Sequence, residues 1–133
     1  METEIAVRYL SKLGHTKEIA ESIAEELGVK AISILEEEAL PSYVDVLFLG
    51  GAPYANIMDD RLREYAKNLD KERVGKVILF TTSNWSRRTV FSLRKILEEK
   101  GIEVGKTYFY AHMLKIEKGK KRAKSFAREA IKE

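Results

Sequence analysis

Hydroxyl, glycine and basic residues gather in one short segment near the start of the sequence. This segment, S-K-L-G-H-T, starts at Ser11 and separates an apolar run from a stretch with helical spacing. Ser11 and Thr16 offer hydroxyl donors. Lys12 and His15 offer charge, and Gly14 lets the backbone turn its amides inward. A helix beginning here would direct free amides and its positive dipole end to one point, which favours a phosphate cradle. The alternative is that Ser11 or Thr16 simply caps that helix.

Two further loops place an aromatic residue among small residues. The first reads G-G-A-P-Y-A-N from Gly50 to Asn56, and its Tyr54 could stack on a planar ligand or pack over the sheet edge. The second reads T-T-S-N-W-S-R-R from Thr81 to Arg88 and contains the only tryptophan, Trp85. Trp85 could stack on a ligand, fill the core or act as a lid. Phosphate donors beside two aromatic loops indicate a flat heterocycle with a phosphate tail.

The composition argues against several other kinds of site. The 133 residues include no cysteine, which excludes disulfides, thiolate metal ligands and cysteine nucleophiles. The two histidines, His15 and His112, provide little material for a zinc site, and we expect His112 to be an edge residue. Ser11 and His15 have no nucleophile–base–orienter arrangement around them. The sequence therefore predicts neither a metal site nor a set of catalytic residues.

The chain carries a small positive charge. Its 24 lysines and arginines against 21 acidic residues give a formal net charge of +3 and a pI near 9.0. This excess is too small to indicate nucleic-acid binding, and the basic run from Lys115 to Lys124 is typical of the solvated face of a last helix. Because Met-Glu-Thr-Glu at the start lacks a basic segment and an apolar segment, we expect no secretory leader, and no apolar run has membrane-spanning length. We expect a cytoplasmic protein that is a monomer or a weak dimer.

Apolar spacing predicts a regular alternation of strands and helices around the three loops. Strands are expected where apolar residues alternate or run continuously, at residues 5–10, 29–35, 44–49, 77–80 and 104–111. Helices are expected where apolar residues recur at helical spacing, at residues 16–27, 62–69, 90–97 and 123–131. Between Glu36 and Ser42 the sequence leaves room for only a brief helix.

This alternation predicts an α/β fold with a parallel sheet and helices on both faces, because each crossover returns the chain to the same sheet edge. Five strands favour a three-layer, doubly wound sheet of order 2-1-3-4-5. No repeat or linker is present, so we expect a single domain over residues 1–133. In this order the loops after the first and third strands diverge and open a crevice. All three loops border that crevice.

At these loops the sequence resembles the flavodoxin family. The family's N-terminal signature has an aromatic strand residue, a hydroxyl two positions later, then small-x-Thr, and an alanine four residues after the threonine. This chain has Tyr9, Ser11, Gly14, Thr16 and Ala20 at those places. The similarity continues through D-V-L-F-L-G-G-A-P-Y-A-N and, weakly, through A-K-S-F-A-R-E-A in the last helix, so it extends over nearly the whole chain.

The resemblance implies noncovalent binding of FMN and electron transfer between redox partner proteins, with the flavin supplying the redox chemistry. The ribityl phosphate would lie on the first loop, and the isoalloxazine ring between the other two. The residues implied for the phosphate are Ser11, Lys12, Leu13, Gly14, His15 and Thr16. Those implied for the ring are Ala52, Pro53, Tyr54, Ala55, Asn56, Ser83, Asn84 and Trp85.

Some features depart from the family pattern. Arg8 replaces an apolar strand residue, which predicts a first strand less buried on that face. Leu13 and His15 stand where threonine and asparagine are common. The chain is basic, whereas flavodoxins are usually acidic. Arg87 and Arg88, on the loop expected beside the ring, favour a flavin potential less negative than that of acidic flavodoxins, and partners other than the usual basic docking surfaces.

Two other functions stay open on the sequence. An FMN-dependent quinone or protoporphyrinogen-type oxidoreductase would share the fold, although 133 residues leave little room for a substrate pocket. A cofactor-free binding module on the same fold is the other, since fold alone does not confer function. A response-regulator receiver is excluded, because Ser11 and Lys12 follow the first strand and Gly50 ends the third, where that class needs acidic residues.

Overall fold

The structure is a computed structural model that describes residues 3–37, 39–54 and 57–132. One parallel sheet contains all of its named strands, in the order β2-β1-β3-β4-β5. The strands are β1 (Ile5–Tyr9), β2 (Ala31–Ser33), β3 (Val44–Gly51), β4 (Val74–Ser83) and β5 (Phe109–His112). The predicted fold class and strand order are confirmed.

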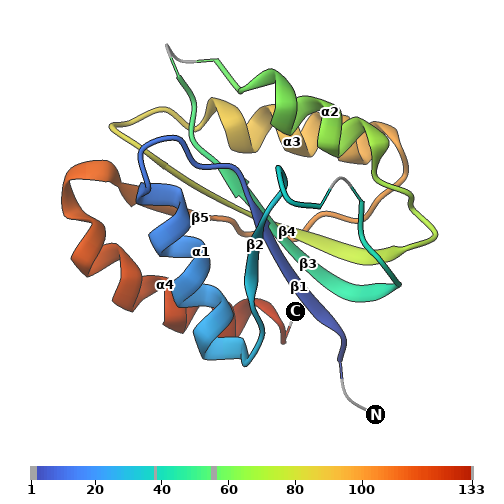
Figure 1. The fold of residues 1–133 in the computed structure, drawn as a ribbon, viewed down its shortest axis with the longest axis horizontal. Helices are drawn as coiled ribbons and strands as arrows, with labels where there is room; N and C mark the ends of the chain where they lie inside the picture. Colours follow the sequence, from blue (N-terminus) through green and yellow to red (C-terminus); the bar gives the residue numbers. More distant parts are fainter. Residues whose placement is uncertain (1–2, 38, 55–56, 133) are drawn as a thin grey trace.

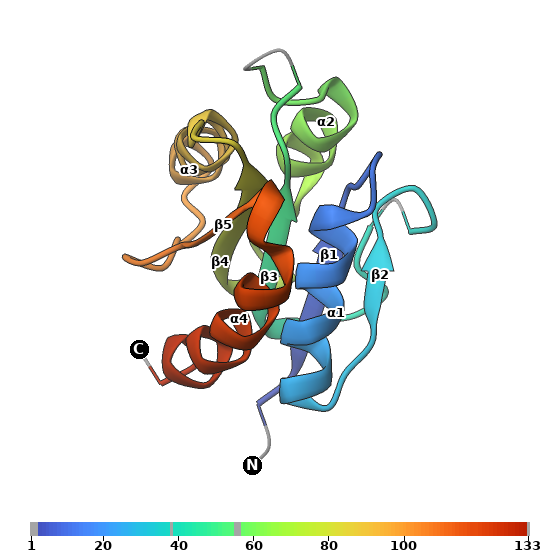
Figure 2. The ribbon, with the colours of Figure 1, turned by 90° about the vertical axis from the view of Figure 1, so that its left-hand side faces the viewer.

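Helices cover both faces of this sheet and complete a three-layer architecture (Figure 1, Figure 2). On one face lie α1 (His15–Leu27) and α4 (Ile116–Ala130), and on the other lie α2 (Asp60–Asn68) and α3 (Arg88–Glu99). A 3₁₀ turn, η1 (Met113–Lys115), joins β5 to α4. Among the described residues, no helix combines the length and the apolarity needed to cross a lipid bilayer.

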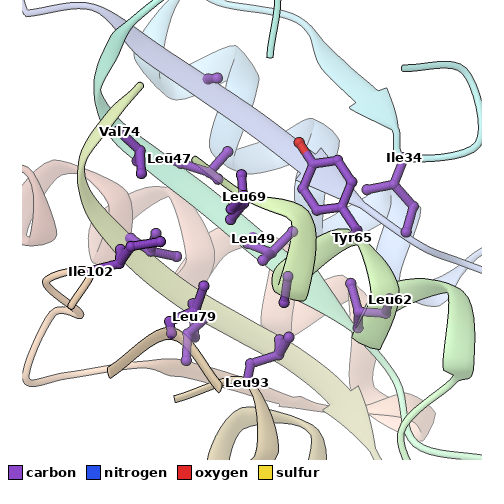
Figure 3. Close-up of a cluster of buried hydrophobic side chains, with 14 of the residues drawn as sticks. Ile34, Leu47, Leu49, Leu62, Tyr65, Leu69, Val74, Leu79, Leu93 and Ile102 are labelled. Carbon is purple, nitrogen blue, oxygen red and sulfur yellow. The ribbon is translucent and has the colours of Figure 1, made fainter. Parts of the chain in front are cut away.

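The sheet separates two clusters of buried apolar side chains. Figure 3 shows the cluster beneath α2 and α3, where Leu49 and Leu79 of the central strands meet Leu93 of α3. The neighbouring strand residues Phe48 and Phe80 point to the opposite face and pack beneath α1 and α4. Successive side chains of a strand alternate between faces. Because β3 and β4 are covered on both faces, their sequences are almost continuously apolar.

Element boundaries differ from the sequence prediction at the sheet edges. The second strand is shorter than expected, because the hydroxyl of Ser33 accepts a hydrogen bond from the amide of Leu35 at 3.1 Å and turns the chain. The prediction of a brief helix within 36–42 is wrong for its described residues, which form turns and bends. The last strand is also shorter, since Val104 pairs only through an isolated bridge, whereas β4 is longer and extends to Ser83.

The prediction that Arg8 marks a less buried face of β1 is wrong. Arg8 is only 5% exposed and lies beneath the segment that follows β2. Its guanidinium forms an ion pair with Glu37 at 3.1 Å and donates to the carbonyl of Val7 at 3.0 Å. A buried charge persists when it is paired in this way. The neighbouring Tyr65 of α2 is also buried, and this burial raises the pKa of its phenol to about 12.

At Gly50, just before the second loop, the backbone of β3 lies very close to β4. A Cβ at this position would overlap both the ring and the carbonyl oxygen of Phe80. We expect Gly50→Ala to lower the free energy of unfolding by about 2–3 kcal/mol, measured by urea denaturation. Gly101→Ala is the control: its Cβ would meet nothing within 4 Å, so only the backbone cost of its positive φ, about 1 kcal/mol, applies. Equal losses in both variants would contradict this account.

Candidate functional site

A cavity of about 280 Å³ opens at the carboxyl ends of β1, β3 and β4. This is the place where the direction of winding reverses in the strand order, since β1 lies between β2 and β3. The walls of the cavity come from the loops that follow these three strands and from η1. The three loops singled out in the sequence therefore meet around one cavity.

Most of the predicted site residues line this cavity. Those that do are Ser11, Leu13, His15, Thr16, Ala52, Pro53, Tyr54, Ser83 and Asn84. Lys12, Gly14 and Trp85 belong to the same loops but do not line it, and Ala55 and Asn56 lie outside the described residues. Three further residues, which the sequence did not predict, also line the cavity: Thr82, Ser86 and Met113. Thr82 and Ser86 fall within the loop already chosen, whereas nothing in the sequence near Met113 pointed to a site.

The N-terminus of α1 forms one end of the cavity. Gly14 precedes the helix with a φ of 96°, in the left-handed region that favours glycine, and its amide donates to the hydroxyl of Ser11 at 3.0 Å. No side chain caps α1. The interpretation of Ser11 or Thr16 as a simple helix cap is therefore wrong. The first amides of α1 and the positive end of its dipole are left for a ligand in the cavity.

Thr16 and His15 extend this end of the cavity with side-chain groups. The hydroxyl of Thr16 is buried and lies 2.8 Å from the hydroxyl of Thr82, which joins α1 to β4. The Nδ1 atom of His15 is buried and has no hydrogen-bond partner. Leaving a buried polar atom unpaired costs about 1–3 kcal/mol. A ligand oxygen beside His15 would remove that cost, so the residues present fit an anionic group such as a phosphate.

Tyr54 fastens the second loop to the first. Its hydroxyl accepts a hydrogen bond from the amide of Lys12 at 3.0 Å, and the Lys12 ammonium lies 4.3 Å from the centre of its ring. The same ammonium lies 3.3 Å from the carboxylate of Asp59, which caps α2 by accepting from the amide of Arg61 at 2.8 Å. Asp59 is therefore the N-cap residue of α2. Tyr54 lines the cavity, and the charge of Lys12 is directed toward Asp59.

Tyr110 of β5 holds the third loop in place. Its hydroxyl lies 3.1 Å from the carbonyl oxygen of Ser83 and donates to that of Asn84 at 2.6 Å. The guanidinium of Arg87 lies 3.8 Å from the centre of the Tyr110 ring and donates to the carbonyl of Trp85 at 2.8 Å. The role of Tyr110 is not predicted from the sequence because, within an apolar strand pattern, this residue is indistinguishable from a core residue.

Trp85 lies on the rim of the cavity rather than in the core. Its side chain is 77% exposed, so the alternative that it fills the core is wrong. Its ring packs edge-on against His112, 5.7 Å away between centres, and the Nδ1 of His112 accepts from the amide of Leu114 at 3.1 Å. His112 is thus an edge residue, as predicted. Because neither Arg87 nor Arg88 lines the cavity, the proposed effect of their charges on a flavin potential stays a prediction.

Several hollows are larger than this cavity, among them one beside α2 and one over the start of α3. The hollow beside α2, about 460 Å³, is lined by two carboxylates, of Asp60 and Glu64, against the one guanidinium of Arg61, and this balance disfavours a phosphate. The hollow over the start of α3, about 480 Å³, is lined by exposed and half-buried side chains of one surface, including Arg88 and Lys95. Within the described part of the chain, no three histidine or acidic side chains are grouped to hold a metal ion. The cavity at the strand ends is therefore the candidate site.

The charge of Asp59, at the end of the second loop, makes the stability of the fold sensitive to acid. Hydrogen bonds from the Arg61 guanidinium hold the pKa of Asp59 at about 2, below its ordinary 3.8. Its charge therefore stabilises the fold above about pH 4, and this contribution is lost as the pH falls through about 2. We expect Asp59→Asn to lower the free energy of unfolding at pH 7 by about 1–2 kcal/mol, and this difference to shrink between pH 4 and pH 2.

The matched control for this prediction is Asp60→Asn, which removes the same charge one residue further along. Asp60 forms no ion pair with any described residue. Urea denaturation of both variants across this pH range checks the prediction. A pH-independent difference between Asp59→Asn and the wild type would show that the charge of Asp59 contributes nothing.

Comparison with known proteins supports the fold and not a sequence family. No family model matches the sequence, and no curated protein matches it in sequence. Among solved structures, oxidised flavodoxin 2 from Bacillus cereus is similar, with a TM-score of 0.81 at 20% identity over 97% of this chain and 98% of that one. A flavodoxin mutant from Fusobacterium nucleatum bound to flavin mononucleotide has a TM-score of 0.70 at 16% identity, over 98% and 96% of the two chains.

The same fold also occurs within a longer protein. Rubredoxin oxygen:oxidoreductase from Desulfovibrio gigas matches with a TM-score of 0.80 at 15% identity, over 95% of this chain but only 34% of that one. At these identities the likeness concerns the arrangement of helices and strands. The resemblance to flavodoxins inferred from the sequence is confirmed at that level, and this chain has the flavodoxin-like fold.

Proposed function

We propose that this protein is an electron carrier that binds FMN noncovalently in the cavity at the strand ends. The observation that carries the proposal is the buried, unpartnered Nδ1 of His15, a residue that lines the cavity at the uncapped start of α1. The phosphate of FMN would accept hydrogen bonds from the first amides of α1 and from the side chains of His15 and Thr16. The similar fold of a flavodoxin bound to flavin mononucleotide supports this choice of ligand.

The isoalloxazine ring would lie between Tyr54 on one wall and Asn84 with Trp85 on the other. A cavity of about 280 Å³ is at the lower limit for small-molecule sites, so part of the ring would stay outside it, against the exposed Trp85 and Leu13. When bound, the flavin supplies the redox chemistry. A ring edge left at the surface suits exchange of electrons with another protein rather than turnover of an enclosed substrate.

In this proposal the chain prepares both walls before the ligand arrives. Tyr54 is held by its hydrogen bond from Lys12, and the carbonyl oxygens of Ser83 and Asn84 are held by Tyr110. Contacts that exist before binding reduce the conformational entropy lost on binding. The cavity is therefore preorganised on three sides, by α1 and by these two loops.

Titration of the apoprotein with FMN, followed by quenching of flavin fluorescence, tests the proposal. We expect stoichiometric binding with a dissociation constant below about 1 μM, corresponding to about 8 kcal/mol. Riboflavin lacks the phosphate and should bind at least roughly tenfold more weakly, because it cannot use the donors at the start of α1. No quenching by either ligand would favour a cofactor-free binding module. Steady turnover of a quinone with reduced nicotinamide would favour an oxidoreductase.

His15→Phe separates the phosphate contact from the rest of the site. The variant keeps a planar ring but removes Nδ1, so we expect FMN to bind roughly tenfold more weakly and riboflavin to bind unchanged. The same substitution at the other histidine, His112→Phe, is the control, because His112 does not line the cavity. Fluorescence titration of both variants with both ligands measures this. Parallel losses of FMN and riboflavin in His15→Phe would place the phosphate elsewhere.

A further inference from the structure

Large apolar side chains are exposed around the mouth of the cavity. Leu13, Ile57, Trp85 and Leu114 are exposed by 69%, 59%, 77% and 82%. Leu13, Ile57 and Trp85 lie on the loops that follow β1, β3 and β4, and Leu114 lies in η1, so all four stand at the carboxyl edge of the sheet, where the cavity opens. They make up most of the exposed large apolar side chains in the described part of the chain. A concentration of this kind marks an interaction surface.

Basic side chains without partners stand at the same edge. Arg88 begins α3, Lys17 lies in the first turn of α1, Lys115 precedes α4 and Lys118 lies in its first turn. All of them are exposed, and none forms an ion pair or a side-chain hydrogen bond with another described residue. Each helix starts where a parallel strand has just ended, so the topology brings these charges together.

The acidic residues near the mouth are largely neutralised. Glu18 and Glu117 share the ammonium of Lys120, at 3.6 Å and 3.3 Å. Asp59 takes part in two ion pairs. Of the acids at the helix starts on this edge, Asp60 alone has no ion pair within the described residues. The mouth therefore carries an excess of unpaired positive charge.

The charges of α3 run against its own dipole. Arg87 and Arg88 stand at its N-terminus with no acidic residue in the first turn, whereas Glu98 and Glu99 close its last turn, which has no basic residue. Helix stability favours the reverse arrangement at both ends. Arg87 is explained by its contacts with Tyr110 and Trp85, but the position of Arg88 is explained neither by helix stability nor by an ion pair with a described residue. A local rule broken in this way points to a functional surface.

We infer that this face is the docking surface for an acidic electron-transfer protein. Carboxylates of the partner would pair with Arg88 and Lys115, while Trp85 and Leu114 form an apolar contact inside that charged rim. Protein interfaces have this layout, with an apolar centre, a polar rim and arginine and tryptophan among the strongest contributors. The inference rests on the proposed function for the reason that such a partner would bind. The unpaired charges and the exposed Ile57 and Leu114 are independent of the cofactor, whereas Leu13 and Trp85 would also contact the flavin.

An acidic protein fits this surface better than the other polyanions. A nucleic acid needs basic side chains that follow a line of phosphates. Here the cations surround exposed apolar residues, and the opposite charge of the partner would steer it to the mouth at low ionic strength. Binding to nucleic acids or to anionic membranes is therefore not part of the inference. The test below includes both, and binding to either would contradict it.

The test is an NMR titration of the isotope-labelled protein with two small haem proteins, acidic cytochrome b5 and basic cytochrome c. Cytochrome b5 should shift the amide signals of the loops around Trp85 and Leu114 at 20 mM salt, and the shifts should fade at 200 mM salt. The double variant Arg88→Glu, Lys115→Glu should bind cytochrome b5 roughly tenfold more weakly. Its thermal stability should not fall, since glutamate suits a helix start.

The control variant is Lys30→Glu, Lys71→Glu, which changes the net charge equally at the opposite edge of the sheet, where both lysines are exposed. It should bind cytochrome b5 as the wild type does. Equal weakening by both double variants would overturn the inference, as would shifts caused by cytochrome c, a DNA duplex or anionic vesicles in place of cytochrome b5. FMN affinity measured on the same samples separates the two proposals. FMN binding without docking contradicts only this inference, and docking without FMN binding contradicts only the proposed cofactor.

Discussion

All five strands run parallel, and every feature of the candidate site depends on this constraint. Parallel pairing sends each strand's carboxyl end to one edge, so loops far apart in sequence meet there. The reversal of winding at β1 and β3 separates two of these loops and leaves the cavity between them. The buried hydrogen bond between Thr16 and Thr82 then ties the start of α1 to the end of β4 across the cavity floor. The reversal of winding and this hydrogen bond set the position of the cavity, and the remaining contacts then position its walls.

The N-termini of α1 and α2, both at this edge, differ in how they are capped. The carboxylate of Asp59 satisfies an amide at the start of α2, whereas no side chain caps α1. An uncapped start leaves polar groups without partners, and the buried Nδ1 of His15 adds another at the same place. Such groups lower stability unless a ligand satisfies them. The difference between the two helices is therefore the physical reason to place an anion beside α1 and not beside α2.

The mouth of the cavity also carries exposed apolar side chains and unpaired cations. Its exposed Ile57 and Leu114 and its unpaired cations do not line the cavity, so binding of a small molecule there does not account for them. The reversed charges of α3 also oppose the stability of that helix. A cavity for a cofactor and a basic, apolar surface around it together describe a molecule that would exchange electrons through contact with an acidic partner.

Local patterns in the sequence determined the alternation of strands and helices and the three loops, because apolar periodicity and the positions of Gly14, Gly50 and Pro53 depend on near neighbours alone. The tertiary structure decided the rest. The edge strand β2 ended early where Ser33 turned the backbone, and Arg8 was buried because Glu37, 29 residues away, pairs with it. Tyr110 and the exposure of Trp85 likewise follow from contacts between distant segments. Spacing along the chain contains no record of such contacts, so only the folded structure could show them.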